Sequence, residues 1–474
     1  MGFRPAVATG LLLALLATAC SGGAAPAGPA APTAPTTPAG SSPAGSAPTT
    51  RPAAAPVGPG PLRPVPVTVP AALRQAPFDV PRQLAVPAGW TVAVHARVPG
   101  ARFLTHVDAD LLVSQPGTGS VQLVRRQPDG TGRVTPWLTG LRRPHDLVPV
   151  RSGHVTWVYV AETHRVVRYP WAAGRTTPAG PGQVVVTGLP DASSPELGGA
   201  YGHELKNIAV VGGALYVSIA STCNVCESDT VATPRRGAIY RYGLTGGPGT
   251  LVATGLRNAE GLAEVPGTGA LWAVVNNRDN IAYPHHRDIT GDGRDDYGTV
   301  VPAYVDDHPM EPFVRVEQGR FYGWPFCNPT QDTPAGARDM PYDRDVQTNP
   351  DGRKADCATA EPVDTGIPAH SAPLGLTFLQ QTPVPAGLRT GAVVALHGSW
   401  NRTRRTGYKV VWFGWQPAAG GGRPGAQQDL VTGWVDASGE QVWGRPVDVA
   451  ADATGSLLVS DDAAGAVYRL TPPR

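Results

Sequence analysis

A short apolar run, a polar turn and a second apolar run recur along most of the chain, and this rhythm constrains the fold more than any other feature. The runs are rich in Val, Leu, Tyr and Trp and are separated by glycine, which is typical of β-hairpins. They occupy residues 110–124, 155–169, 213–221 with 237–242, 269–277, 391–400 with 407–413, and 455–470. No sustained 3.6-residue periodicity accompanies them, so helices should be few. All-β repeats of roughly 40 to 60 residues predict a six-bladed β-propeller.

The first 20 residues have a different character. Arg4 is followed by "LLLALLATA", an apolar stretch too short to span a bilayer, which is typical of an export signal. The small residues before Cys20 and the "SGG" after it resemble a bacterial lipobox. We therefore expect a lipoprotein signal peptide over 1–20 and a mature chain that begins at a lipidated Cys20, on the outer face of the bacterial cytoplasmic membrane. An ordinary signal peptide followed by a free cysteine stays the alternative.

Residues 21–75 are almost all Ala, Pro, Gly, Ser and Thr. Such a segment cannot bury enough apolar surface to offset its chain entropy, so we expect a disordered tether. The propeller should then occupy residues 76–474. The formal net charge is only +2, which gives no electrostatic reason to expect a nucleic-acid partner. Contact with a membrane is expected only through the lipid on Cys20.

Five cysteines are an odd number for an exported chain, and lipidation of Cys20 removes the oddity. The remaining Cys223, Cys226, Cys327 and Cys357 suffice for two disulfides outside the cytosol. Of the three possible pairings we favour Cys223–Cys226 with Cys327–Cys357. A zinc site made of all four thiolates is the alternative, although the chain has a single CxxC motif.

Four polar clusters lie beside predicted strands, at 202–207 ("GHELKN"), 255–262 ("GLRNAEGL"), 397–402 ("HGSWNR") and 443–449 ("WGRPVDV"). In a propeller the loops on one face build the site, so these clusters should lie close together. His203 has the chemistry of a general base near neutral pH. The arginines suit a polyanionic ligand, because a guanidinium pairs with carboxylates through two parallel hydrogen bonds. A single surface histidine is more often structural, but four clusters at strand edges favour a site.

Seven motifs occur in an order that resembles the glucose/sorbosone dehydrogenase family, soluble six-bladed propellers that use pyrroloquinoline quinone (PQQ). They are "LYVSIASTCNVC", "GLRNAEGL", "YGWPFCNP", "HSAPLGLTFL", "ALHGSWNR", "GRPVDVA" and "LLVSDDAAGAVYRL". The resemblance covers about residues 85–474 and is stronger to the sorbosone-type branch. It implies PQQ- and Ca²⁺-dependent oxidation of a small-molecule sugar, such as an aldose, sorbosone or a related alcohol or aldehyde. The electron acceptor is left open.

The same resemblance implies roles for individual residues. His203 falls where the family has its base, which takes a proton as hydride passes to the quinone. Arg257 and Asn258 match cofactor contacts beside the reactive carbonyl, and Arg445 matches an arginine that pairs with the cofactor's carboxylates. Arg402 is the nearest cation to the family's cofactor-binding lysine.

Two further positions concern the metal and the base. The main-chain carbonyls of Asn277 and Arg278 fall where the family holds the calcium that also binds the cofactor. The family's aspartate near the base is replaced by Ser221 or Thr222, and a second cofactor arginine reads Val447. Glu204 is a candidate to orient His203 instead.

The loop 287–298 has an EF-hand-like spacing of oxygen ligands, with glycine at position 6. Position 12 is Thr299 rather than glutamate, so the site would be incomplete or would borrow a ligand from Asp306 or Asp307. A second, structural calcium is expected here, and a solvated acidic turn is the alternative. The candidate ligands are Asp288, Thr290, Asp292 and Asp296.

Two other functions stay open at this stage. A calcium-dependent propeller lactonase would need a metal held by side-chain carboxylates at the centre, whereas the clusters here are basic. A non-enzymatic propeller lipoprotein could bind a ligand or a glycan through the same face. Titration with PQQ would separate the three functions.

Overall fold

The computed structural model describes residues 58–418, 420–436 and 438–473. The expected signal peptide, the lipidated Cys20 and most of the expected tether lie outside these residues. In the described part, no helix is long and apolar enough to cross a membrane. Two short helices, α1 (Pro302–Asp307) and α2 (Ala386–Arg389), interrupt a chain built almost entirely of strands. Single 3₁₀ turns cover Ala71–Leu73, Pro116–Thr118, Pro195–Leu197, Glu227–Thr230 and Cys357–Thr359.

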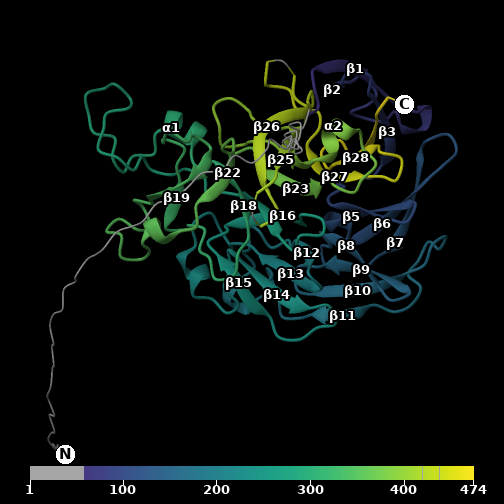
Figure 1. Cartoon of the computed structure of the whole chain (residues 1–474), viewed down its shortest axis with the longest axis horizontal. Coiled ribbons are helices and arrows are strands. Elements are labelled where there is room, and N and C mark those ends of the chain that lie inside the picture. The colour runs from purple at the N-terminus through teal and green to yellow at the C-terminus, as the bar shows by residue number, and fades with distance from the viewer. Residues whose placement is uncertain (1–57, 419, 437, 474) are drawn as a thin grey trace, which may run out of the picture. The chain divides into compact units, whose positions relative to one another are not determined.

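Six main sheets follow one another along the described chain (Figure 1). Five are antiparallel, and the sixth is mixed because β1 pairs with β3 in parallel. Blade 1 contains β4 (Leu104–Val107), β5 (Asp110–Gln115), β6 (Ser120–Arg126) and β7 (Gly132–Leu138). Blade 2 contains β8 (Leu147–Ser152), β9 (Val155–Ala161), β10 (Val166–Trp171) and β11 (Gln183–Val186). Blade 3 contains β12 (Ile208–Val211), β13 (Ala214–Ile219), β14 (Ala238–Gly243) and β15 (Thr250–Thr254).

The remaining blades are more elaborate. Blade 4 contains β16 (Asn258–Glu264), β17 (Leu271–Asn276), β18 (Glu311–Arg315), β22 (Val363–Ile367) and β20 (Arg338–Met340). Beside it lies a small sheet of β19 (Cys327–Pro329) and β21 (Tyr342–Arg344). Blade 5 contains β23 (Pro373–Phe378), β24 (Gly391–Leu396), β25 (Lys409–Gln416) and β26 (Arg423–Val431). Blade 6 contains β27 (Pro446–Ala451), β28 (Leu457–Asp461), β29 (Ala466–Thr471), β3 (Thr91–Arg97), β1 (Leu62–Thr68) and β2 (Gln83–Pro87).

The first strand of each blade contacts the first strand of the next, in the order β4, β8, β12, β16, β23 and β27. Strand β27 also contacts β4, which closes the ring. The predicted six-bladed β-propeller is therefore confirmed. In a propeller each blade keeps only short, protected sheet edges.

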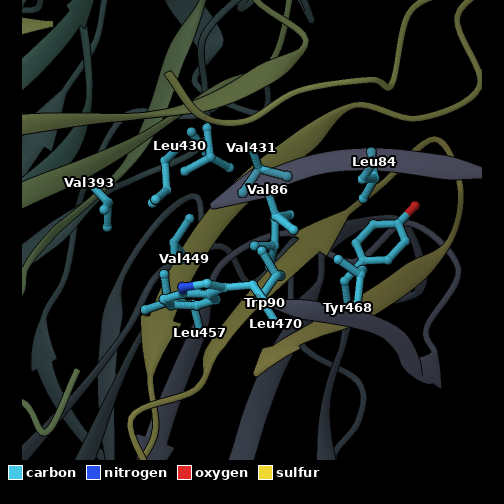
Figure 2. Close-up of a cluster of buried hydrophobic side chains, with 14 of the residues drawn as sticks. Leu84, Val86, Trp90, Val393, Leu430, Val431, Val449, Leu457, Tyr468 and Leu470 are labelled. Carbon is cyan, nitrogen blue, oxygen red and sulfur yellow. The ribbon is translucent and has the colours of Figure 1, made fainter. Parts of the chain in front are cut away.

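Blade 6 joins the two ends of the described chain. Strand β3 pairs with β29, so that Val92 lies opposite Leu470. In Figure 1 the purple first strands accordingly lie beside the yellow last strands. Behind this seam lies a large apolar core, in which Trp90, Tyr468 and Leu84 are buried with residues of β26 (Figure 2). The ring thus depends on burial of apolar surface shared between residues far apart in sequence.

The expected boundary of the tether at residue 75 is wrong. Strand β1 begins at Leu62 and pairs with β2, where Val65 lies opposite Leu84. Val67 is buried and Val65 packs against the core of blade 6. The apolar alternation within "LRPVPVT" explains this, because every second side chain of a strand faces the same side. The abundance of proline and alanine around it hid that pattern in the sequence.

Both favoured disulfides, Cys223–Cys226 and Cys327–Cys357, are present. The alternative of a four-thiolate zinc site is thereby excluded for these cysteines. The first bridge closes a tight loop after β13, and the second fastens the small β19–β21 sheet to the 3₁₀ turn at Cys357–Thr359. Both bridges lie in connections rather than in the ring of first strands.

Candidate active site

The start of each first strand and the end of each second strand lie at the same edge of the propeller, because the two strands are antiparallel. Arg257 and Arg445 directly precede β16 and β27, and Arg102 lies just before β4. His203 lies in the segment that leads into β12. The repeat therefore delivers these side chains to one end of the ring.

A cavity of about 670 Å³ opens at this end. Five of the predicted site residues line it, namely His203, Arg257, Asn258, Asn277 and Arg445. The structure brings them together with residues that the sequence did not single out: Arg102, Asn224, Asp279, Glu311 and His370. Three arginines therefore line one pocket together with three histidines, His203, His370 and His397.

His203 is held as a neutral imidazole. Its Nδ1 lies 2.9 Å from the carbonyl oxygen of Ser221 and 3.0 Å from the Ser221 hydroxyl. A carbonyl only accepts hydrogen bonds, so Nδ1 carries the proton and Nε2 is left as an acceptor. Burial, reinforced by the positive charge of Arg257, lowers the pKa of His203 to about 4. A histidine in this state is unprotonated at neutral pH, so its Nε2 can accept a hydrogen bond from a substrate hydroxyl.

The proposed orienting role of Glu204 is wrong. Its carboxylate pairs with Arg143 and accepts a hydrogen bond from the Ala192 amide, 3.0 Å away. Adjacent residues on an extended segment point to opposite sides, which separates Glu204 from the imidazole next to it. Ser221, the residue that replaces the family's aspartate, supplies the contact instead.

Arg257 is buried and held from several directions. Its Nη2 donates to Asn224 Oδ1 at 3.0 Å and lies 3.2 Å from Asp279 Oδ2. Its Nε donates to the Asn224 carbonyl at 3.2 Å. The Asn224 side chain also bonds both the amide and the carbonyl of Asp279, each at 2.9 Å. The Cys223–Cys226 loop thus works as a clamp that fixes the guanidinium in the pocket.

His370 and Glu311 extend this network. His370 Nδ1 lies 3.4 Å from Asp279 Oδ1, and its Nε2 lies 2.7 Å from the Val305 carbonyl. Burial disfavours the charged imidazole, but Asp279 and Glu311 outweigh it, so the pKa of His370 is raised. Burial raises the pKa of Glu311 to about 7 against the opposing effect of His370. His370 has a φ of 61°, a left-handed conformation that is costly for a residue with a Cβ.

On the other side of the pocket, Arg445 is held by main-chain oxygens. Its Nε donates to the His397 carbonyl at 3.1 Å and its Nη2 to the Gly398 carbonyl at 3.0 Å. Its Nη1 has no partner among the residues that the structure describes. Arg102 pairs with Asp462 at 2.9 Å, and the same carboxylate accepts from His397 Nε2 at 2.9 Å. Arg445 therefore presents a donor that a ligand can take.

Two predicted side chains lie elsewhere. Arg402 does not line the pocket; it pairs with Asp307 at 3.0 Å, on the connection that bears α1. The Arg278 side chain is buried against Asp345 and Gln347. The prediction for Arg278 and Asn277 concerned their carbonyl oxygens, and neither oxygen accepts a hydrogen bond from any described residue. Val447, at the position of the missing second arginine, is fully buried.

Carboxylates of the loop 287–298 accept hydrogen bonds from the backbone amides of the same loop. Asp288 accepts hydrogen bonds from the amides of Gly291 and Gly293, at 2.6 and 2.7 Å. Asp296 accepts from the amides of Ile289 and Thr290, at 2.8 and 3.0 Å. The possible extra ligands are engaged as well, because Asp306 accepts from the Thr403 amide and Asp307 pairs with Arg402.

Across the described ranges, no group of three or more His, Cys, Asp or Glu side chains is placed to hold a metal ion. The second calcium at Asp288, Thr290, Asp292 and Asp296 therefore stays a prediction, and the geometry resembles the alternative of an acidic turn.

The residues that the sequence missed fall into three groups. Asn224 lies between the two cysteines of the Cys223–Cys226 bridge. Arg102 lies just before the first strand of blade 1, as Arg257 and Arg445 lie just before the first strands of their blades. The repeat could therefore have predicted Arg102 as a site residue. Asp279, Glu311 and His370 lie in or beside the long connections of blade 4, outside the repeat. No local pattern marked them.

Fold and pocket together define a six-bladed propeller with an arginine-lined cavity at one end of its ring. A TrAA12-like family model matches residues 84–473, and the chain belongs to this family. A PQQ-dependent pyranose dehydrogenase from Coprinopsis cinerea is 32% identical over 245 residues, which cover 46% of this chain and 31% of that protein. An uncharacterized protein from Borreliella burgdorferi is 32% identical over 104 residues, 22% of this chain and 27% of that protein. The chain thus spans about a third or less of the length of these relatives.

Solved structures agree on the fold. The holo PQQ domain of the Coprinopsis cinerea pyranose dehydrogenase superposes with a TM-score of 0.64 at 22% identity, over 82% of this chain and 97% of that one. A calcium structure of a Trichoderma reesei family AA12 enzyme gives 0.63 at 22% identity, over 82% and 96%. A glucose dehydrogenase gives 0.53 at 14% identity, over 81% and 99%. The resemblance to PQQ-dependent sugar dehydrogenases that the sequence indicated is confirmed.

Proposed function

We propose that this protein is a PQQ- and Ca²⁺-dependent dehydrogenase that oxidises a sugar, either an aldose, sorbosone or a related alcohol or aldehyde. One observation carries the proposal. A neutral His203, whose Nε2 has no hydrogen-bond partner among the described residues, lines the same cavity as three arginines, Arg102, Arg257 and Arg445. We further propose that the protein is exported and held at the outer face of the bacterial cytoplasmic membrane by lipid on Cys20.

The pocket suits PQQ, which carries three carboxylates. Arg102, Arg257 and Arg445 all line the pocket, the first two paired with Asp462 and Asp279. Arg445 forms no ion pair with a described residue and has an unengaged Nη1 to donate to an anion. The unbonded carbonyls of Asn277 and Arg278 are oxygen ligands of the kind that Ca²⁺ prefers. When bound, the quinone supplies a hydride acceptor whose oxygens the Ca²⁺ polarises.

The chain's own residues then divide the remaining work. His203 accepts the proton of the substrate hydroxyl at Nε2, while Ser221 keeps the proton on Nδ1 and fixes the ring. Arg257 stabilises negative charge that develops beside it, and Asn224 and Asp279 hold it in place beforehand. This arrangement needs little reorganisation during the reaction.

The test begins with cofactor-free protein titrated with PQQ and Ca²⁺, followed by dye reduction across a panel of aldoses. We expect PQQ to bind at micromolar concentration or tighter and at least one sugar to be oxidised. His203→Ala should abolish turnover and largely spare PQQ binding. His154→Ala, on the exposed turn between β8 and β9, is the matched control and should behave like the wild type.

The outcomes separate the candidate functions. Absence of PQQ binding would refute the proposal. Binding without oxidation of any sugar, in a protein that retains ligand affinity, would instead favour the non-enzymatic ligand- or glycan-binding propeller. Independently, Cys20→Ala should release the protein from the membrane fraction, and retention there would contradict the lipid anchor.

A further inference from the structure

A second cavity, of about 300 Å³, lies behind the Cys223–Cys226 loop, and we call it the outer pocket. Its walls include Phe321, Trp324, Phe326, Arg235 and Lys354. Asn224 separates it from the active site. Asn224 lines the active-site cavity, and its carbonyl accepts the Trp324 Nε1–H at 2.9 Å from the side of the outer pocket.

The outer pocket combines aromatic walls with an available cation. Arg236 is tied to Asp229 and Glu196, and Lys354 is paired with Glu227 at 2.6 Å. The Arg235 guanidinium, by contrast, forms no ion pair or side-chain hydrogen bond with any residue between 58 and 473 that the structure describes. Aromatic faces stack on planar rings and a guanidinium pairs with sulfonate or carboxylate, so the lining suits a planar, anionic aromatic molecule.

The outer pocket is also close to the reactive centre. The Asn224 carbonyl that accepts from Trp324 accepts from Arg257 Nε as well, at 3.2 Å. Gly255 lines the outer pocket, and two residues later Arg257 lines the active site, a chain span of at most about 7 Å. A molecule bound there would lie near the reduced cofactor without occupying the place of the sugar.

We propose that the outer pocket binds the electron acceptor, and that this acceptor is a planar anionic quinone. The proposal rests on the proposed dehydrogenase function. In the net reaction the sugar loses two electrons and two protons, and the quinone gains two electrons and two protons to become a hydroquinone. The acceptor could then bind while sugar or product still occupies the central cavity.

Anthraquinone-2,6-disulfonate is the probe, titrated into cofactor-free protein by calorimetry and again in the presence of saturating PQQ and Ca²⁺. We expect one binding site for the probe to remain when saturating PQQ occupies the central cavity. Arg235→Glu should weaken it at least about tenfold, because a charge-assisted contact becomes a repulsive one. Arg241→Glu, the same charge change at an exposed position of β14 outside the outer pocket, should have no effect.

In the loaded enzyme, Arg235→Glu should raise the KM for the probe about tenfold and leave the KM for the sugar unchanged. Loss of all probe binding when PQQ is added would place the probe in the central cavity and overturn the proposal, as would equal affinities of the Arg235→Glu and Arg241→Glu variants. The calorimetric arm requires neither PQQ nor turnover. Failure of the acceptor site and failure of the dehydrogenase function are therefore distinguishable.

Discussion

Acidification from pH 7.5 to pH 5.0 should destabilise the wild-type protein by about 2 kcal/mol more than the His203→Gln variant. Burial and Arg257 lower the pKa of His203 from 6.5 to about 4, so the fold prefers the neutral imidazole by about 3 kcal/mol. The unfolded chain binds a proton at His203 as the pH falls below 6.5, whereas the folded chain does not until about pH 4. Stability from this group is therefore present above pH 6.5 and is lost as the pH falls. About 2 kcal/mol has gone by pH 5.0.

The assay is equilibrium urea unfolding of cofactor-free protein at both pH values, with midpoints converted to free energies through the measured slope. His397, whose pKa burial also lowers to about 4, is present in both proteins and cancels from the comparison. His154→Gln serves as a control, since His154 lies on an exposed turn. A double difference below about 0.5 kcal/mol would show that His203 titrates near its ordinary pKa, and the argument for a neutral base held by Ser221 would fail.

Three further predictions follow from the contacts of the site and the disulfides. Arg445→Ala should weaken PQQ binding about tenfold or more, measured by calorimetry with Ca²⁺ present, because a donor facing the ligand is lost; unchanged affinity would contradict the fit. Asn224→Ala should remove the clamp on Arg257 and lower the free energy of unfolding by about 2 to 4 kcal/mol, measured in urea; a loss under 1 kcal/mol would be inconsistent with it. Replacement of Cys327 and Cys357 by serine should cost roughly 3 to 4 kcal/mol, since that bridge closes a separation of 30 residues; an unshifted urea midpoint would refute this.

The sequence predicted the parts of the site that the repeat controls. The number of predicted hairpins indicated six blades. The polar clusters beside the first strands of blades indicated His203, Arg257 and Arg445 as site residues. The repeat fixes where those strands begin, so residues of distant blades could be assigned to one pocket without any knowledge of distances. Strand β1 was missed for the opposite reason. Its composition resembles a linker, and only its pairing with β2 shows that its alternating valines face a core.

Blade 4 contains site residues that the repeat pattern could not predict. Asp279 belongs to a connection that leaves β17 and returns by way of α1 to β18, where Glu311 is the first residue. The local sequence pattern does not predict where that long connection places its side chains. The contact of Asp279 with both Arg257 and His370 depends on tertiary packing. His370 reaches it through a left-handed backbone conformation that its residue type does not favour.

The remaining error, over what orients His203, has a general cause in this architecture. Side chains at or before the starts of three first strands each contact a main-chain oxygen at or just after the end of a second strand. The Ser221 carbonyl holds His203, the Asn276 carbonyl accepts from Arg257 at 3.4 Å, and the His397 carbonyl holds Arg445. A carbonyl places no demand on residue type. The functional side chains are therefore visible in the sequence while their supports are not, and the loss of an aspartate at Ser221 removes a side chain without removing the acceptor that fixes the base.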